Sequence, residues 1–106
     1  MSNTIMDESE LSIKPELLPM LAAYVENKLK KVSSFIAEWP VPLPEVREWA
    51  HQTKGTGSSL GLDQVTLFSK SLEDAAKDGD EEGSRKGLDS LHNHLKQVRQ
   101  MLKDCS

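Results

Sequence analysis

Residues 88–102 read LDSLHNHLKQVRQML, and their apolar side chains recur at alternating intervals of three and four residues. The regularly spaced members are Leu88, Leu91, Leu95, Val98 and Leu102. With 3.6 residues per turn, this spacing gathers them into one stripe along an α-helix. Such a stripe is typical of a helix that packs into a bundle. The stretch therefore predicts a long amphipathic helix whose apolar stripe other helices must cover.

The first of three preceding helices is expected to begin between Pro15 and Pro19, because proline is tolerated only in a first helical turn. It ends at the run PVPLP, residues 40–44, since alternating prolines cannot continue a helix. Its apolar residues also recur at helical spacing. They are Leu18, Leu21, Val25, Leu29, Val32, Phe35, Ile36 and Trp39. Residues 1–14 are interpreted as a flexible or weakly helical lead-in.

The second helix is expected from about Pro44 to about Leu60, with Gly61 as its C-terminal cap. The third follows a very short connection and ends before the DGD turn at 78–80. Its apolar stripe consists of Val65, Phe68, Leu72 and either Ala75 or Ala76. No segment shows the period-two alternation of a β-strand. The sequence thus predicts an all-α fold, an antiparallel four-helix bundle over residues 15–106.

Two glycines weaken the beginning of the fourth helix. Gly83 and Gly87 each cost roughly 1 kcal/mol relative to alanine in a helix interior. We therefore expect fraying there, and a helix that starts as late as Ser84. The acidic residues nearby are interpreted as a solvated turn that also favours a helix N-terminus. They are Asp78, Asp80, Glu81 and Glu82.

The composition indicates one globular domain, since 37% of the 106 residues are hydrophobic and 28% are charged. The net charge of −4 and the dispersed lysines and arginines argue against nucleic acid as a partner. The single cysteine, Cys105, excludes an internal disulfide. No apolar run is long enough for a signal peptide or a membrane span. We therefore expect a reduced, monomeric, cytoplasmic protein that does not bind membranes.

The second helix contains AHQTKGTGSSLG at residues 50–61. At about 100° per residue, its core-facing side consists of Val46, Trp49, Ala50, Thr53, Gly57 and Leu60. His51 lies roughly 150° from the centre of that side, so its ring is expected to face solvent. Its neighbours on the helix surface include two cations, a glycine and a hydroxyl. The cations are Arg47 and Lys54, the glycine is Gly55, and the hydroxyl is that of Ser58, one turn further along; the acid Glu48 is a further neighbour.

The glycine nearest to the imidazole has no explanation in packing. Gly55 costs about 1 kcal/mol in a helix interior and does not face the core. A missing side chain one turn from His51 would let the surface of another protein approach the ring. Gly57, in contrast, lies on the buried side, where close helix packing explains it.

These residue types suit phosphoryl transfer. A neutral imidazole has one nitrogen that can act as a nucleophile, while the other donates a hydrogen bond that fixes the tautomer. Lys54 can place a cation on the phosphoryl oxygens, and catalysis of this transfer is mostly positioning and charge stabilisation. Arg47 is a second cation near the ring, and residue type alone does not choose between the two.

The segment around His51 resembles the signature of histidine-containing phosphotransfer (HPt) domains, which act in multistep two-component phosphorelays. The resemblance is strongest over residues 49–79 and extends, as a bundle pattern, over about 17–104. The matching residues are Ala50, His51-x-x-Lys54-Gly55, Leu60-Gly61-Leu62 and Leu72-Glu73.

The resemblance implies a four-helix bundle, with room for a short extra N-terminal helix, and a set of residue roles. It implies that His51 is phosphorylated on Nε2 by the aspartyl phosphate of one receiver domain and passes the group to another. Lys54 would stabilise the phosphoryl oxygens, Gly55 would admit the receiver, and Glu73 would hydrogen-bond to the other ring nitrogen. Its partners would be response-regulator receiver domains and a hybrid sensor histidine kinase. The chain would be a phosphocarrier and not an enzyme, with no cofactor of its own, because the receiver supplies magnesium.

Two alternatives remain open. A helical adaptor would bind a receiver or a kinase without carrying phosphate, although such an adaptor has no need of His51. A phosphorylatable domain of a chemotaxis-type kinase shares the bundle, but the chain is too short for a kinase catalytic part and has no nucleotide-binding glycine loop.

Three other polar residues are interpreted structurally. Thr53 stands where the family commonly has an apolar residue, and we expect its hydroxyl to bond back to a carbonyl one turn earlier. His92 and His94 are two positions apart, which puts them on different faces of a helix and disfavours a shared metal. Both histidines are interpreted as surface residues.

Overall fold

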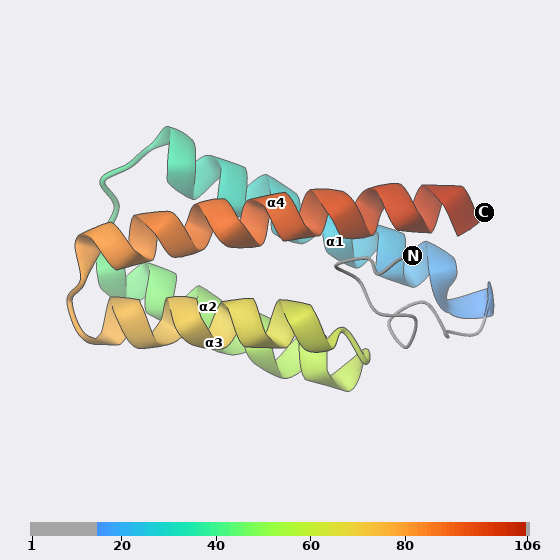
Figure 1. The fold of residues 1–106 in the computed structure, drawn as a ribbon, viewed down its shortest axis with the longest axis horizontal. Coiled ribbons are helices and arrows are strands. Elements are labelled where there is room, and N and C mark those ends of the chain that lie inside the picture. The colour runs from blue at the N-terminus through green and yellow to red at the C-terminus, as the bar shows by residue number, and fades with distance from the viewer. Residues whose placement is uncertain (1–14, 106) are drawn as a thin grey trace, which may run out of the picture.

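Residues 15–105, the part of the chain that this computed structural model describes, contain four α-helices and one short 3-10 turn, joined by short loops. In order, the elements are η2 (Pro15–Leu17), α1 (Leu18–Ala37), α2 (Leu43–Ser59), α3 (Asp63–Lys77) and α4 (Glu81–Cys105). Successive helices run antiparallel, with α4 beside α1 and α3 beside α2 (Figure 1). The described residues form no strand, so the predicted all-α four-helix bundle is confirmed. The lead-in expected over residues 1–14 lies outside this range.

Prolines set the junction between the first two helices. α1 begins at Leu18, inside the expected interval, and Pro19 lies in its first turn. The N–H groups of a first turn have no partner within the helix, so proline loses nothing there. α1 ends at Ala37, ahead of the proline-rich run, and α2 begins at Leu43 with Pro44 in its first turn.

Glycines in the left-handed conformation end α2 and α3. Gly61 and Gly79 have φ angles of 77° and 74°, a backbone conformation in which a Cβ atom is strained. After Gly61, the N–H of Leu62 donates back to the carbonyl of Gly57 at 2.8 Å. After Gly79, the next N–H likewise donates to the carbonyl of Ala75, at 2.9 Å. Both ends are Schellman caps, which confirms Gly61 as the cap of α2.

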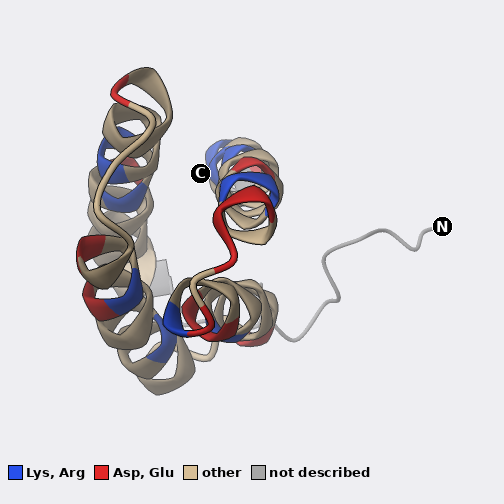
Figure 2. Cartoon of the chain, turned by 90° about the vertical axis from the view of Figure 1, so that its left-hand side faces the viewer, with Lys and Arg blue, Asp and Glu red and all other residues tan. Residues whose placement is uncertain are grey.

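The expected late start of α4 is wrong, because the helix begins at Glu81 and not at Ser84. Asp80 caps it: Oδ1 of this residue accepts a hydrogen bond from the backbone N–H of Gly83 at 2.9 Å. A good N-cap stabilises a helix by about 1 kcal/mol, which offsets the cost of one glycine. Figure 2 views the end of the bundle where α3 turns into α4 and shows acidic residues gathered on this turn. Their charges also favour a helix N-terminus.

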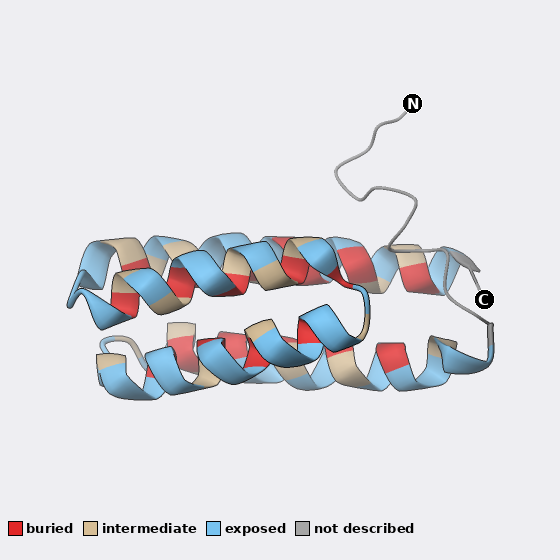
Figure 3. Ribbon diagram, turned by 90° about the horizontal axis from the view of Figure 1, so that it is seen from below, coloured by how far each residue is buried: buried red, intermediate tan, exposed pale blue. Residues whose placement is uncertain are grey.

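The core is one apolar cluster to which all four helices contribute. The buried residues form inward-facing bands on each helix, and exposed residues cover the outside (Figure 3). Every member of the apolar stripe at residues 88–102 is buried, as predicted. On α3, Ala76 is buried and Ala75 is not, while Phe68 is half-buried.

One histidine lies in this core, contrary to the expectation that both histidines of α4 are surface residues. His94 is only 2% exposed, and its ring centroid lies 5.1 Å from that of Phe68. Neither ring nitrogen has a hydrogen-bond partner within residues 15–105. The position follows three residues after Leu91 and four before Val98, so it belongs to the apolar stripe by spacing. The separation of two residues between His92 and His94 bears on a shared metal site but does not predict whether either ring is buried.

Replacing His94 with leucine should stabilise the bundle, most of all in acid. Burial lowers the pKa of His94 below its usual 6.5. Below pH 6.5 the unfolded chain therefore binds a proton at this residue while the folded chain resists it, and stability falls with pH. Removing two unpaired ring nitrogens should raise the free energy of unfolding by about 1 kcal/mol at pH 7.5, and by more at pH 5.5. Urea unfolding at the two pH values measures both effects.

The control for this experiment is His92→Gln on the same helix. The pKa of His92 is also lowered by partial burial, so this histidine also makes the fold less stable as the pH falls. Its removal gives a reference for the effect of replacing a histidine that is not buried in the core. An equal loss of stability on acidification in wild type and His94→Leu would contradict the assignment.

Candidate functional site

The side of α2 that carries His51 faces solvent because the other side fills the core. Val46, Ala50, Thr53 and Gly57 are buried, whereas the side chain of His51 is 66% exposed. Adding 100° per residue from Ala50 turns the next side chain away from the core. The histidine ring therefore lies on the surface of the middle part of a helix.

A carboxylate from the neighbouring helix connects the two polar side chains of α2. Glu73 on α3 places Oε2 2.8 Å from His51 Nδ1, and Oε1 2.8 Å from Lys54 Nζ. The side chain of Glu73 is 18% exposed and that of Lys54 is 32% exposed. The structure thus brings His51, Lys54 and Glu73 together in one network across the α2–α3 interface.

The charge of Glu73 decides the tautomer of the histidine. The hydrogen bond from the Lys54 ammonium lowers the pKa of the Glu73 carboxyl, partial burial opposes this, and the bond to His51 lowers it further. An ionised carboxylate only accepts hydrogen bonds, so His51 Nδ1 must be the donor. In the neutral ring the other nitrogen, Nε2, then has the free lone pair. The arrangement presents a nucleophilic nitrogen on an exposed ring.

The two glycines of α2 differ as the sequence predicts. A Cβ atom added to Gly55 would meet no atom within 4 Å, so this position is open space beside the site. A Cβ atom added to Gly57 would lie 3.0 Å from Thr66 Oγ1 and 3.3 Å from a methyl carbon of Val65. Gly57 therefore permits the close approach of α3, while no contact within the described residues requires a glycine at residue 55.

Hydroxyl groups from both neighbouring helices hold the glycine-containing turn of α2. Tyr24 on α1 places its hydroxyl 3.3 Å from the carbonyl oxygen of Thr53 and 2.9 Å from Thr56 Oγ1. Thr66 on α3 places Oγ1 3.4 Å from the carbonyl oxygen of Lys54. The sequence pattern does not single out Tyr24 or Thr66, because each acts on a helix other than its own.

Three residues near His51 do not join the network. Arg47 and Ser58 are exposed, and neither bonds to His51, Lys54 or Glu73 in the described part of the chain. Thr53 is fully buried, and its hydroxyl has no hydrogen-bond partner among residues 15–105. The expected bond back to a carbonyl is therefore wrong, and the side chain is held by packing alone.

No group of three or more histidine, cysteine or acidic side chains within the described residues is arranged to hold a metal ion. His92 is half-exposed and bonds to Ser33 on α1, with 3.2 Å between Nε2 and Oγ. His94, two residues further along α4, is buried and points to a different side of the helix. Among the three histidines, His51 alone has a carboxylate on one ring nitrogen and an exposed ring.

A family model described as the Hpt domain matches residues 15–101. The chain belongs to the Hpt domain family. Comparison with curated proteins gave no match, and comparison with solved structures gave none either.

Membership of the Hpt family confirms the resemblance inferred from the motif and gives the coarse function. Hpt domains are histidine phosphotransfer modules of phosphorelays, and they interact with receiver domains and kinases without being kinases themselves. None of the helices within residues 15–105 is long and apolar enough to cross a bilayer.

Proposed function

We propose that this Hpt domain accepts a phosphoryl group on His51 from the aspartyl phosphate of one receiver domain and passes it to another receiver domain. The observation that carries the proposal is the exposed His51 ring, whose Nδ1 is held by Glu73 at 2.8 Å. This bond leaves Nε2 as the nucleophile. The partners are response-regulator receiver domains and a hybrid sensor histidine kinase, in the cytoplasm.

The transfer needs little chemistry from this chain beyond the nucleophile. The lone pair of His51 Nε2 attacks phosphorus, an N–P bond forms, and the P–O bond to the receiver's aspartate breaks. The carboxylate leaves with the bonding electrons, and the second transfer reverses these steps. The proton stays on Nδ1, where the charge of Glu73 offsets the positive charge that the phosphorylated ring acquires. The receiver supplies the magnesium.

Two further residues act on the transferred group and on its donor. Lys54 has to leave or share its bond with Glu73 to reach the phosphoryl oxygens, and its 32% exposure leaves it free to move toward solvent. Gly55 has open space where a Cβ atom would stand, and a docked receiver occupies that space.

The direct test is labelling of the full chain by purified receiver domains that carry radioactive aspartyl phosphate. We expect rapid transfer from at least one receiver, and no labelling when ATP is the only donor. The label should resist alkali and be lost in acid, as expected of an N–P bond. Labelling from ATP without a kinase would contradict the proposal, while receiver binding without any labelling would favour the adaptor.

Replacing Glu73 should slow the transfer without unfolding the domain. Glu73→Ala removes a hydrogen bond to a charged group, worth about 1.5 kcal/mol, and we expect transfer from the receiver to slow about tenfold. Glu73→Gln keeps an oxygen that can accept from Nδ1 and should lose less. Stability should change by less than about 1 kcal/mol, because the ion pairs are partly solvated.

Nitrogen chemical shifts of the His51 ring measure the cause of this effect. In wild type, the Nδ1-protonated tautomer should dominate when the ring is neutral, and in Glu73→Ala it should not. The lowered pKa of Glu73 keeps the carboxylate ionised down to below pH 4.5, so its hold on the ring should persist across the physiological range. Slower transfer with an unchanged tautomer would show that Glu73 acts in another way.

A further inference from the structure

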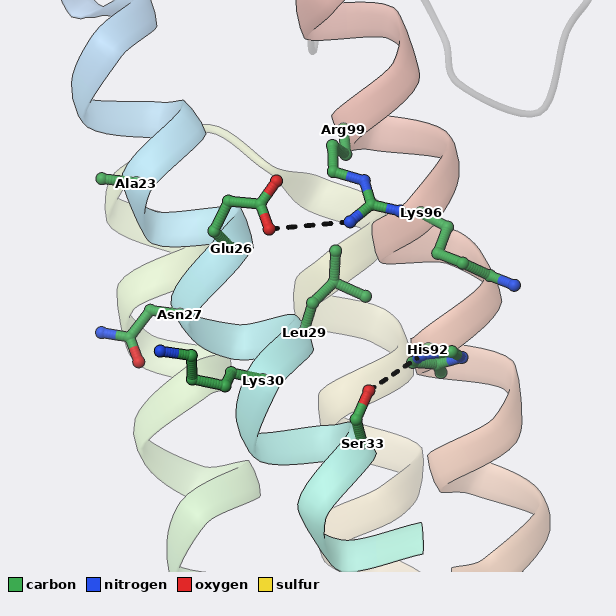
Figure 4. Close-up of a pocket in the computed structure, with 9 residues that line it drawn as sticks. All are labelled: Ala23, Glu26, Asn27, Leu29, Lys30, Ser33, His92, Lys96 and Arg99. Carbon is green, nitrogen blue, oxygen red and sulfur yellow. Dashed lines mark hydrogen bonds and ion pairs between the residues drawn. The ribbon is translucent and has the colours of Figure 1, made fainter. Parts of the chain in front are cut away.

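A groove with a volume of about 830 Å³ runs between α1 and α4, and no residue of the His51 network lines it. Figure 4 looks into this groove, with α2 and α3 behind the two helices that form it. Its lining extends along α1 from Ala23 to Ser33, which corresponds to about 15 Å at 1.5 Å per residue. The site on α2 and α3 and the groove on α1 and α4 therefore belong to different sides of the bundle.

The groove is positively charged in an acidic chain. It is lined by Lys30, Lys96 and Arg99 with one carboxylate, Glu26, whereas the whole chain has a net charge of −4. Within the described residues, Lys30 and Lys96 have no ion-pair partner. Arg99 contacts the Glu26 carboxylate only at 3.6 Å (Figure 4). The Lys30 side chain extends toward Asn27 on the side of α1 away from α4, and that of Lys96 extends away from α1 (Figure 4), so the two ammonium groups flank the groove, where an anionic ligand can reach them.

The floor and the sides of the groove offer other contacts. Leu29, which is 6% exposed, lies at its base between the helices. His92 Nε2 and Ser33 Oγ meet across it at 3.2 Å (Figure 4). Partial burial lowers the pKa of His92, Lys96 and Arg99 lower it further, and only Asp89 raises it. Two of the cations that line the groove thus act on the His92 ring.

We propose that the groove between α1 and α4 binds an acidic peptide segment of a protein partner. A channel about 15 Å long takes four or five residues of extended chain, at about 3.3 Å each. Cations that flank a groove with an apolar base suit a segment that carries both carboxylate and apolar side chains, and charge complementarity would direct the encounter. Nucleic acid is disfavoured, since the cations form a short cluster and not a basic face. A segment docked here leaves His51 accessible, so a partner can be held while its receiver domain exchanges phosphate.

The test is a titration of the full chain, labelled with ¹⁵N, with the synthetic peptide acetyl-EELEELEE-amide at low salt. We expect shift changes confined to the amides of residues 23–33 and 92–99, with a dissociation constant below about 1 mM. The pKa of His92 should rise on binding, because added carboxylates stabilise its protonated form. The basic peptide acetyl-KKLKKLKK-amide should cause no such changes.

Charge reversal separates the groove from general electrostatics. The double variant Lys30→Glu/Lys96→Glu should weaken binding at least tenfold, whereas Lys77→Glu/Lys86→Glu, the same charge change elsewhere, should weaken it less than twofold. Equal weakening by the two variants, shift changes centred on His51, or no binding at 5 mM peptide would each overturn the proposal. Circular dichroism and phosphoramidate labelling of His51 should be unchanged in both variants, so this outcome is independent of the function proposed for His51.

Discussion

His51→Gln should abolish labelling of the chain by a phosphorylated receiver domain while its helical circular dichroism stays that of wild type. The side chain of His51 is 66% exposed and is hydrogen-bonded to Glu73, so its replacement removes no packing contact from the core. Glutamine is a good helix former and its amide can still donate to Glu73. Its amide nitrogen has no nucleophilic lone pair, so no N–P bond can form. Incorporation of radiolabel, measured beside the unfolding curve, separates loss of chemistry from loss of fold.

The matched control is the same substitution on α4, His92→Gln, which should be labelled like wild type. His92 lies on α4 and bonds to Ser33 on α1, so it belongs to the other pair of helices. Full labelling of His51→Gln, or loss of labelling in His92→Gln alone, would place the phosphoryl group elsewhere.

The helices and most of their ends could be predicted from the sequence because they depend on regularly spaced apolar residues and on local turn residues. The stripe at residues 88–102, the prolines at 40–44 and the two turn glycines all act within one helix or one loop, where local geometry is decisive. For the same reason the outward orientation of His51 and the open space at Gly55 followed from counting along α2. The pattern could not reveal the distances by which Glu73 reaches α2, because these depend on how α3 is rotated against it.

The expectations that failed concern two buried polar side chains and the start of one helix. His94 has the spacing of a core residue but the chemistry of a surface residue, and here spacing prevailed. Gly83 weakens α4, yet the side chain of Asp80 turns back onto its N–H and the helix starts early. Thr53 is buried without the hydrogen bond that its hydroxyl would favour. In each case burial or capping by a neighbour outweighs the intrinsic preference of the residue.

A helix with two glycines a turn before its end needs support from elsewhere in the fold. Tyr24 and Thr66 place hydroxyls at the carbonyls of Thr53 and Lys54 from opposite sides. These contacts restrain the backbone immediately before Gly55 without covering its exposed surface. The bundle therefore compensates for the flexibility of glycine while keeping the space beside His51 open.

Gly55→Gln should slow phosphotransfer from a receiver domain at least tenfold while the domain folds at least as well as wild type. No atom of residues 15–105 outside the local helix backbone lies within 4 Å of an added Cβ, so the substitution meets no clash in this part of the chain. Replacing an exposed helical glycine should stabilise α2 by up to about 1 kcal/mol, most with alanine and somewhat less with glutamine. A glutamine one turn from His51 occupies the space that the receiver needs. Ser71→Gln, about 160° around α3 from Glu73, is the control and should transfer normally.

A second phosphodonor distinguishes exclusion of the receiver from damage to the imidazole. Phosphoramidate is small and needs no docked protein, so it should label Gly55→Gln at nearly the rate of wild type. If both donors are slowed equally, the substitution has perturbed His51 or its bond to Glu73 and not the approach of the partner. If transfer from the receiver is unchanged, the open space at Gly55 has no part in docking. Slow transfer from the receiver with normal labelling by phosphoramidate is the result that steric access requires, because only the protein donor has to enter the space beside the ring.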